Sequence, residues 1–197
     1  MPESMSVAEL AIALALAWGA GIRLYVVLFL CGLAHWLGWV TLPRDLAVLA
    51  HPLALAASGF ITTVEFFADK VPWVDSLWDV VHTFIRIPAG AALAAIAFQD
   101  AGSAYPAAAA ILGGSVAAAA HFAKAGARGL VNLSPEPVSN WTASLGEDAA
   151  VPAGLWLALA YPWAFLALLA AGALAAVLFA GWILRGISAV LGKYRLP

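Results

Sequence analysis

The chain has 197 residues, of which 64% are hydrophobic and only 10% are charged, and its formal net charge is −2. Soluble domains carry about 25% charged residues, so this composition excludes an ordinary soluble protein. The weak negative charge gives no footprint for nucleic acid, and the single cysteine excludes an internal disulfide. We therefore expect one integral membrane domain over residues 1–197, with the lipid bilayer as its partner.

The apolar runs predict an all-α, polytopic helical membrane protein. They are rich in Ala and Leu and lack strand alternation, and a membrane helix satisfies its own backbone hydrogen bonds. A chain of this length allows about five or six spans of about 20 residues. The N-terminal run has Glu3 and Glu9 but no Lys or Arg, unlike a cleaved signal peptide, so we expect a retained first helix. Arg185, Lys193 and Arg195 favour a cytoplasmic C-terminus, and we expect a multi-pass protein of the inner (cytoplasmic) membrane of the cell.

Glycine and proline divide the first half of the chain into segments. The first apolar stretch covers 6–39 and is interrupted at Gly19, Ala20 and Gly21, and a second helix covers about 46–68. Val71-Pro72 ends that helix, an amphipathic segment follows over 74–87, and Pro88 opens a short apolar helix to about Phe98.

The second half begins after a turn at 99–103 with a helix over about 106–124. Two prolines within 132–140 predict non-helical backbone, which we expect to re-enter the membrane in part, although a surface loop is the alternative. Residues 151–191 are apolar throughout and form two spans, or one long helix that is kinked at Pro162.

A faint internal repeat relates the two halves. Residues 20–23 and 125–128 both read Ala-Gly-x-Arg, and residues 49–52 and 159–162 both read Leu-Ala-x-Pro. The repeat halves would be 5–69 and 104–192, with 70–103 as the linker. Broken helices at matching positions of two halves are typical of a transporter site, whereas the alternative is chance similarity in a chain rich in Ala and Gly. The repeat is inverted if the linker contains one span and parallel if it contains none or two.

The segment 65–86 gathers seven ionisable side chains in an otherwise apolar chain. Asp75, Asp79, His82 and Arg86 follow one another at helical spacing and predict a single polar helix face, opposite an apolar face that includes Phe84. Ionisable residues inside membrane segments are expensive, so this segment is the first place to look for function.

Four stretches of the chain also resemble a known family. They are 21–25, 64–72, 75–86 and 132–141. Together they are similar to a family of small bacterial multi-pass membrane proteins that is known only as a domain of unknown function. The resemblance extends over nearly the whole chain, and it implies no activity, substrate or catalytic residue.

The acidic residues form one candidate site. A set of four carboxylates and one imidazole suits a divalent cation or a proton relay. The residues of this candidate metal set are Glu65, Asp69, Asp75, Asp79 and His82. The alternative is an interfacial connector whose charges lie in water.

The basic residues form a second candidate site. Arg23, Arg86, Lys124 and Arg128 either pair with the carboxylates or bind an anion such as phosphate or a carboxylate. Residues Asn132, Glu136 and Asn140 of the predicted non-helical stretch complete the candidate ion-binding or substrate-binding set.

Three functions remain open from the sequence. The first is a channel or secondary transporter for an ion or small polar solute, which uses the carboxylates, His82 and the basic residues. The second is a membrane-embedded metal-dependent enzyme that acts on a lipid phosphate, although an enzyme would more often gather its polar groups at one surface. The third is a structural subunit, and small-residue faces around Gly90 and Gly172 would permit a homodimer.

Overall fold

The computed structural model describes residues 6–99, 102, 104–133 and 137–193, which form helices joined by turns and loops, with no strand. The elements in this part of the chain are α1 (Val7–Trp36), the short 3₁₀-helix η1 (Leu46–Ala50), α2 (Pro52–Ala68), α3 (Pro72–Ala97), α4 (Ala104–Val131), α5 (Pro137–Ala160) and α6 (Pro162–Lys193). The prediction of an all-α protein is confirmed.

Local sequence explains where most of the helices begin. Four helices start at a proline, whose fixed φ suits the first helical position and whose missing N–H has no partner there: Pro52, Pro72, Pro137 and Pro162. Helix α1 instead begins with a capping box, in which the Ser6 side chain accepts from the Glu9 N–H and the Glu9 carboxylate accepts from the Ser6 N–H.

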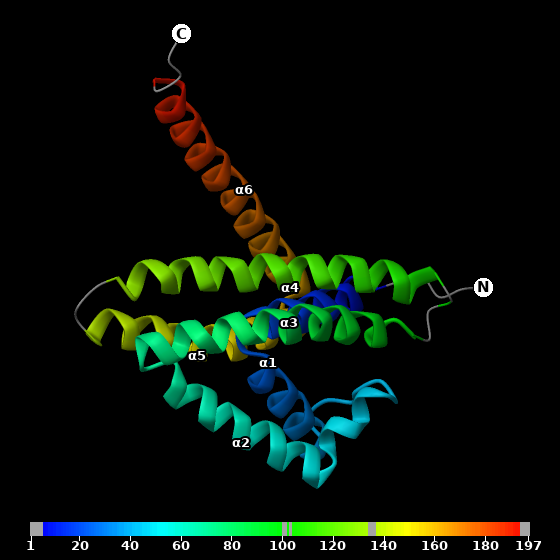
Figure 1. The fold of residues 1–197 in the computed structure, drawn as a ribbon. Coiled ribbons are helices and arrows are strands. Elements are labelled where there is room, and N and C mark those ends of the chain that lie inside the picture. The colour runs from blue at the N-terminus through cyan, green and yellow to red at the C-terminus, as the bar shows by residue number, and fades with distance from the viewer. Residues whose placement is uncertain (1–5, 100–101, 103, 134–136, 194–197) are drawn as a thin grey trace.

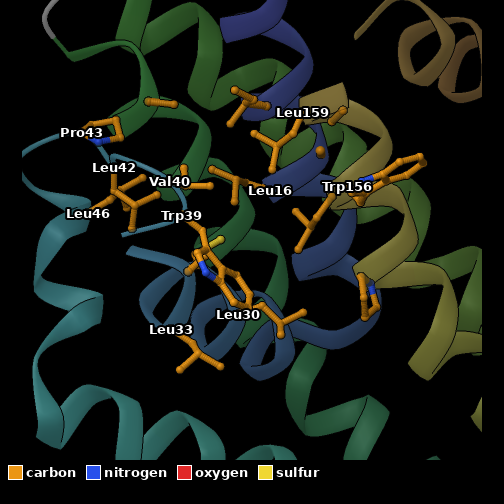
Figure 2. A pocket seen from close by; sticks show the side chains of 18 residues that line it. Leu16, Leu30, Leu33, Trp39, Val40, Leu42, Pro43, Leu46, Trp156 and Leu159 are labelled. Carbon is orange, nitrogen blue, oxygen red and sulfur yellow. The ribbon is translucent and has the colours of Figure 1, made fainter. Parts of the chain in front are cut away.

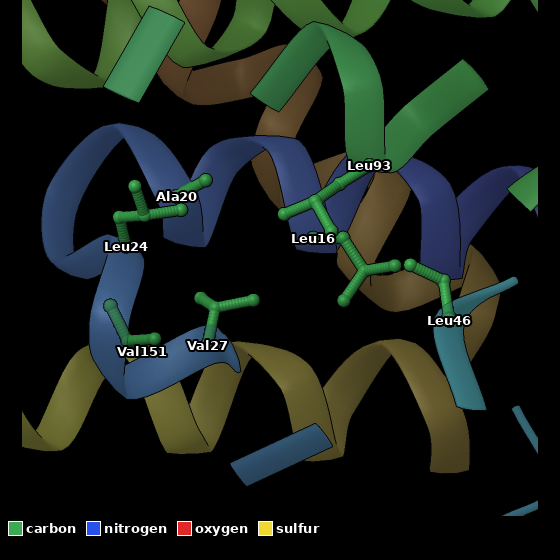
Figure 3. Packing of buried hydrophobic residues seen from close by; sticks show 7 residues of the cluster. All are labelled: Leu16, Ala20, Leu24, Val27, Leu46, Leu93 and Val151. Carbon is green, nitrogen blue, oxygen red and sulfur yellow. The ribbon is translucent and has the colours of Figure 1, made fainter. Parts of the chain in front are cut away.

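Helix α1 lies at the centre of the fold. It packs against α3, α4 and α5 and also contacts α2, η1 and α6. Figure 1 shows α3, α4 and α5 running along the first part of α1, while α2 and α6 leave this bundle in opposite directions. The apolar core around α1 draws side chains from α1, η1, α3 and α5 (Figure 3): Leu16, Ala20, Leu24, Val27, Leu46, Leu93 and Val151.

A seam of small residues lets α1, α3 and α4 approach closely. A Cβ atom added to Gly21 would lie 2.3 Å from the Ala117 carbonyl oxygen, and one added to Gly90 would lie 2.4 Å from the Ala117 Cβ. A Cβ atom at Gly113 would lie 2.4 Å from the Ala94 Cβ. Because lipid tails are as apolar as the helices, such close contact is a main source of attraction between membrane helices.

Four helices among the described residues are long and apolar enough to cross a membrane: α1, α3 from Trp73 to Ala97, α4, and α6 from Pro162 to Trp182. This is fewer than the five or six spans expected from chain length. Helix α2 has 17 residues, which rise about 25 Å and fall short of the roughly 30 Å hydrocarbon core. Helix α5 has polar residues in its first half and is not among the four.

Two predicted boundaries are wrong. Helix α3 runs without interruption from Pro72 through Pro88 to Ala97, so the amphipathic segment and the short apolar helix are one element. The stretch 132–140 is not wholly non-helical, because α5 already begins at Pro137 and includes Asn140. In both places the proline is compatible with a helix, at its first position in α5 and within a membrane span in α3.

Helix α6 projects from the bundle (Figure 1), and from Pro162 to Trp182 it is apolar on all sides. Only 6% of its most apolar window is buried, and Trp163 and Trp182 are both at least 70% exposed. A helix that is apolar all round is typical of a membrane span, so lipid is its natural surrounding. The homodimer through the small residues near Gly172 stays a prediction.

The repeat was predicted from two pairs of matching motifs, and the structure shows the local backbone at each of them. Pro52 and Pro162 both begin helices, as expected for matching junctions. Helix α1 is broken at Arg23, where φ is −143° and ψ is 75°, but α4 continues through Gly126 and Arg128 to Val131. The break is therefore present in the first half and absent from the second, and the repeat itself stays a prediction.

The small-residue seam predicts opposite effects for two identical substitutions in α4. Gly113→Ala places a methyl group against Ala94 and should lower the free energy of unfolding by about 1–3 kcal/mol. Gly126→Ala meets nothing within 4 Å and should be neutral or stabilise by up to about 1 kcal/mol, since alanine is the better helix former. Denaturant unfolding in detergent, followed by tryptophan fluorescence, measures both. Equal stabilities of the two variants would contradict close packing at the seam.

Candidate functional site

The break in α1 brings Arg23 into the interior of the bundle, where its side chain is 1% exposed. A broken helix leaves carbonyl groups without their usual N–H partners. The Lys124 ammonium of α4 donates to one of them, the Ile22 carbonyl, at 3.3 Å. Unwound backbone and two cationic side chains from different helices therefore meet inside the protein.

The polar face predicted for α3 is confirmed. Asp75, Asp79, His82 and Arg86 are all buried, whereas Leu77 and Phe84 on the opposite face are 59% and 80% exposed. Charged groups inside and large apolar groups outside are the reverse of a soluble helix, so α3 faces lipid with its apolar side. The charges consequently do not lie in water, and the interpretation of this segment as a solvated connector is wrong.

Arg86 lies near the middle of α3 and joins two carboxylates. Its guanidinium forms an ion pair with Glu65 of α2 and a second with Asp79, at 2.7 Å. Glu65 and Arg86 are both completely buried. Asp79 also lies 3.3 Å from the Lys124 ammonium, which connects this pair to the next part of the site.

Three basic side chains surround the Asp69 carboxylate at the end of α2. Its Oδ2 lies 2.5 Å from Arg23 Nη1, 3.4 Å from Arg128 Nη2 and 3.8 Å from Lys124 Nζ. The same three side chains approach Glu147 of α5, with Arg128 Nε at 2.9 Å, Lys124 Nζ at 3.4 Å and Arg23 Nη2 at 3.6 Å. Two carboxylates on different helices thus share one set of three cations.

We call the ten side chains joined by these contacts the ion-pair network. It also includes Asp148, 3.0 Å from Arg23, and Asp75, 3.8 Å from Arg128. Its members are Arg23, Glu65, Asp69, Asp75, Asp79, Arg86, Lys124, Arg128, Glu147 and Asp148. The network thus contains six carboxyl groups and four basic side chains, and all five of the helices α1 to α5 contribute to it.

Asn132 and Asn140 lie at the end of the network near the start of α3, beside Asp75 and Arg128. The Asn132 side chain donates to the Asp75 carboxylate at 3.1 Å and accepts from the Asn140 side-chain amide at 2.7 Å. The backbone carbonyl of Asn140 accepts from Arg128 at 3.0 Å. These contacts confirm that the polar stretch after Arg128 lies beside the charged residues. Glu136, the third candidate of this stretch, lies outside the described residues.

Aromatic and histidine side chains lie at the other end of the network, near Arg86 in the middle of α3. His82 stacks on Trp78, and its ring nitrogens meet the Trp78 carbonyl at 2.7 Å and the Tyr25 hydroxyl at 3.2 Å. His121 of α4 meets the Thr83 hydroxyl at 2.7 Å. His82 therefore contacts neutral partners rather than the carboxylates with which it was grouped.

The five residues of the predicted metal set do not converge. No group of three or more His, Cys, Asp or Glu side chains among the described residues is arranged to hold a metal ion. Glu65, Asp69 and Asp79 are instead turned toward arginine and lysine, because these basic side chains supply the positive charge that a cation would supply.

Several members of the site were not predicted from the sequence. Glu147 and Asp148 do not belong to the candidate sets identified in the sequence, and neither does Ser144, which accepts from Arg23 at 3.2 Å. From Asn140 these residues follow at spacings of 4, 7 and 8, which is one face of a helix. Recognising that α5 begins at Pro137 would have identified this face.

Lys70 and Asp148 lie at the rim of the network, outside the four spans. Lys70 donates to the Phe66 carbonyl and, at 3.4 Å, to Ser144. Burial lowers the pKa of the Lys70 ammonium, whereas the nearby Asp148 raises it. Burial also raises the pKa of the Asp148 carboxyl, against the opposite effect of Arg23 and Lys70. Both charged forms are thus less favourable here than in water.

A separate apolar cavity of about 400 Å³ lies in the bend of α1, between the two parts of that helix, the loop before η1 and α5 (Figure 2). Its wall includes Leu16, Leu30, Trp39, Trp156 and Leu159, and no member of the ion-pair network lines it. The cavity offers no charged group for chemistry, so the candidate site is the network.

Removing Arg86 should destabilise the protein strongly. Arg86→Gln leaves Glu65 and Asp79 without their main partner, and breaking a buried pair costs about 3–5 kcal/mol of unfolding free energy. Arg44→Gln, in the exposed loop before η1, should change stability by less than about 0.5 kcal/mol. Denaturant titration in detergent compares the two, and an equal effect would contradict a structural role for the Arg86 pairs.

Comparison with known proteins identifies a family but no activity. The profile of the family described as a domain of unknown function, DUF4126, matches residues 10–183, which include the whole ion-pair network. No curated protein and no solved structure matches the chain. Because the match extends over most of the sequence, the chain belongs to the DUF4126 family, in agreement with the resemblance seen in its sequence motifs.

Proposed function

We propose that this protein is a small secondary transporter or channel of the bacterial inner membrane, and that an ion or small polar solute moves through the ion-pair network. The observation that carries the proposal is the position of ten ionisable side chains inside a bundle whose outer surface is apolar. Charge at membrane depth is costly, and where it occurs it commonly marks a substrate or ion pathway.

The network is long enough to reach the middle of the membrane. On α3 it extends from Asp75 near the start of the helix to Arg86 near its centre. The 11 residue steps between them rise about 16 Å, roughly half of a 30 Å hydrocarbon core. A polar solute that enters the network would therefore meet charged side chains from one surface to about the midplane.

The two sides of this path differ. On the side of α5, Glu147 and Asp148 are 16% and 23% exposed. Beyond Arg86, α3 continues into the seam where Gly90 and Ala94 pack against α4. Access from one side and close packing on the other are expected of one conformation of an alternating-access transporter, so we favour a transporter over an open channel.

A structural subunit is the second candidate, and the pairing of the charges favours it. Each of the four basic side chains of the network lies within ion-pair distance of at least two carboxylates. Such pairs are compatible with a purely architectural role. The metal-dependent enzyme has no comparable support, because the carboxylates it would need are bound to basic side chains in the described part of the chain.

Reconstitution in liposomes tests the transport proposal. We expect purified protein to produce a flux under an imposed ion or pH gradient. Glu65→Gln should change the rate by at least about tenfold, the equivalent of about 1.4 kcal/mol, because it removes a completely buried partner of Arg86. Arg44→Gln, which lies outside the network, should leave the flux within about twofold of the parent.

The structural alternative predicts a different pattern. Tight liposomes would then show no flux for protons, monovalent ions, divalent ions or small anions, while substitutions in the network would still lower stability. That result, obtained with folded protein that elutes as a single species, would remove the transport proposal.

A further inference from the structure

The strongest unassigned feature of the network is the arrangement of its three central cations. Arg23, Lys124 and Arg128 come from two helices and are no more than 6% exposed. All three lie within 4 Å of Asp69, and all three lie within 4 Å of Glu147. Three basic side chains that share two separate carboxylates form a site with the chemistry of an anion receptor.

The two carboxylates are not equivalent. Asp69 ends α2 and is completely buried, so it cannot move without disturbing the corner between α2 and α3. Glu147 lies on α5 at the rim of the network and is 16% exposed, so its side chain already lies partly at the surface. Of the two anionic ligands, only Glu147 is placed to leave and return.

We propose that Arg23, Lys124 and Arg128 bind a small monovalent carboxylate, and that Glu147 occupies this site in the conformation described here. The incoming anion replaces the Glu147 carboxylate, which moves to the surface. The inference rests on the proposed transport function, because it names the class of solute that the network would accept.

An unused donor atom supports the proposal. Arg23 Nε is buried and makes no hydrogen bond, whereas Arg128 Nη2 makes no hydrogen bond but lies 3.4 Å from Asp69 Oδ2. A buried donor without a partner loses its hydration without compensation, so a ligand oxygen at this place would restore a favourable contact. Ser144, whose hydroxyl and carbonyl both accept from Arg23, forms the adjoining wall on α5.

The balance of charge decides the class of anion. The network has six carboxyl groups and four basic side chains, and Lys70 at the rim adds a fifth basic group. Exchange of the Glu147 carboxylate for another carboxylate leaves this balance unchanged. A phosphate dianion would add a further negative charge to a buried site that already has an excess, which is costly at low dielectric.

Polar and ionisable side chains from all five helices α1 to α5 make up the network and its immediate surroundings. Helix α1 contributes Arg23 and Tyr25, and α2 contributes Glu65 and Asp69. From α3 come Asp75, Asp79, His82 and Arg86, and from α4 come His121, Lys124 and Arg128. Helix α5 contributes Glu147 and Asp148. Among the carboxylates that pair with the three proposed binding cations, Glu147 and Asp148 of α5 are the most exposed, at 16% and 23%.

Calorimetry of the purified protein with acetate and formate tests the site directly. Glu147→Gln removes the carboxylate that competes for the site while keeping its size. In the parent protein, acetate binds only to the fraction of molecules in which Glu147 has left the site, and this lowers the apparent affinity by the same fraction. Acetate affinity should therefore rise about tenfold or more in the variant. Asp148→Asn leaves Glu147 in place and should raise the affinity less. Asp45→Asn, which is exposed and outside the network, should leave it within about twofold.

The results separate this inference from the proposed function. No gain in acetate affinity for folded Glu147→Gln, an equal gain for Asp148→Asn, or tighter binding of inorganic phosphate than of acetate would overturn the carboxylate site. Binding of acetate with the expected gain but without flux in liposomes would support the site and remove the transport function. Flux of cations alone, with no acetate binding, would support transport and overturn the site.

Arg128→Gln adds a check on the receptor itself. Because Arg128 makes the shortest contact to Glu147, at 2.9 Å, the Glu147→Gln/Arg128→Gln double variant should lose most of the gained acetate affinity. Should that variant fail to fold, Lys124→Gln in the same Glu147→Gln background replaces it, since Lys124 also lies within ion-pair distance of Glu147. Retention of full affinity in the folded double variant would overturn the assignment.

Discussion

The pairing of four buried basic side chains with carboxylates is the interaction on which the rest of the structure depends. Apolar burial does little to hold membrane helices together, because lipid is as apolar as the helix surfaces. An unpaired charge in the interior is far more costly, so each buried cation must stay beside a carboxylate. Lys124 shows the consequence, since it draws Asp69, Asp79 and Glu147 toward α4 from three other elements.

The break in α1 makes this pairing possible. Small residues before the break allow α1 to lie against α4, with Gly21 directly beside Ala117. The non-helical backbone at Arg23 then turns the second part of α1 away, which exposes the Ile22 carbonyl to Lys124. The charged network therefore depends on one irregularity in α1, which lies next to the small-residue seam.

Much of this could be predicted from the sequence, and the remainder depends on contacts between distant segments. Composition predicted the all-α membrane class, and helical spacing predicted the buried face of α3 from Asp75 to Arg86. Spacing cannot show that Glu65 meets an arginine rather than a metal ion, because that depends on how α2 is oriented. The polar face of α5 was missed because the prolines at 135 and 137 were interpreted as preventing a helix, whereas Pro137 begins one.

The two parts of the bundle differ in how readily their contacts can be exchanged. In the seam, a Cβ atom added to Gly113 would lie 2.4 Å from the Ala94 Cβ, so this contact has no room for a larger side chain. In the network, Lys124 lies between 3.3 and 3.8 Å from three carboxylates, and Glu147 lies within ion-pair distance of three cations. A small shift can replace one partner with another without leaving a buried charge unpaired. A carboxylate of the network, such as Glu147, can therefore change partners at lower cost than a residue of the seam, and displacement of Glu147 by an incoming anion requires such a change.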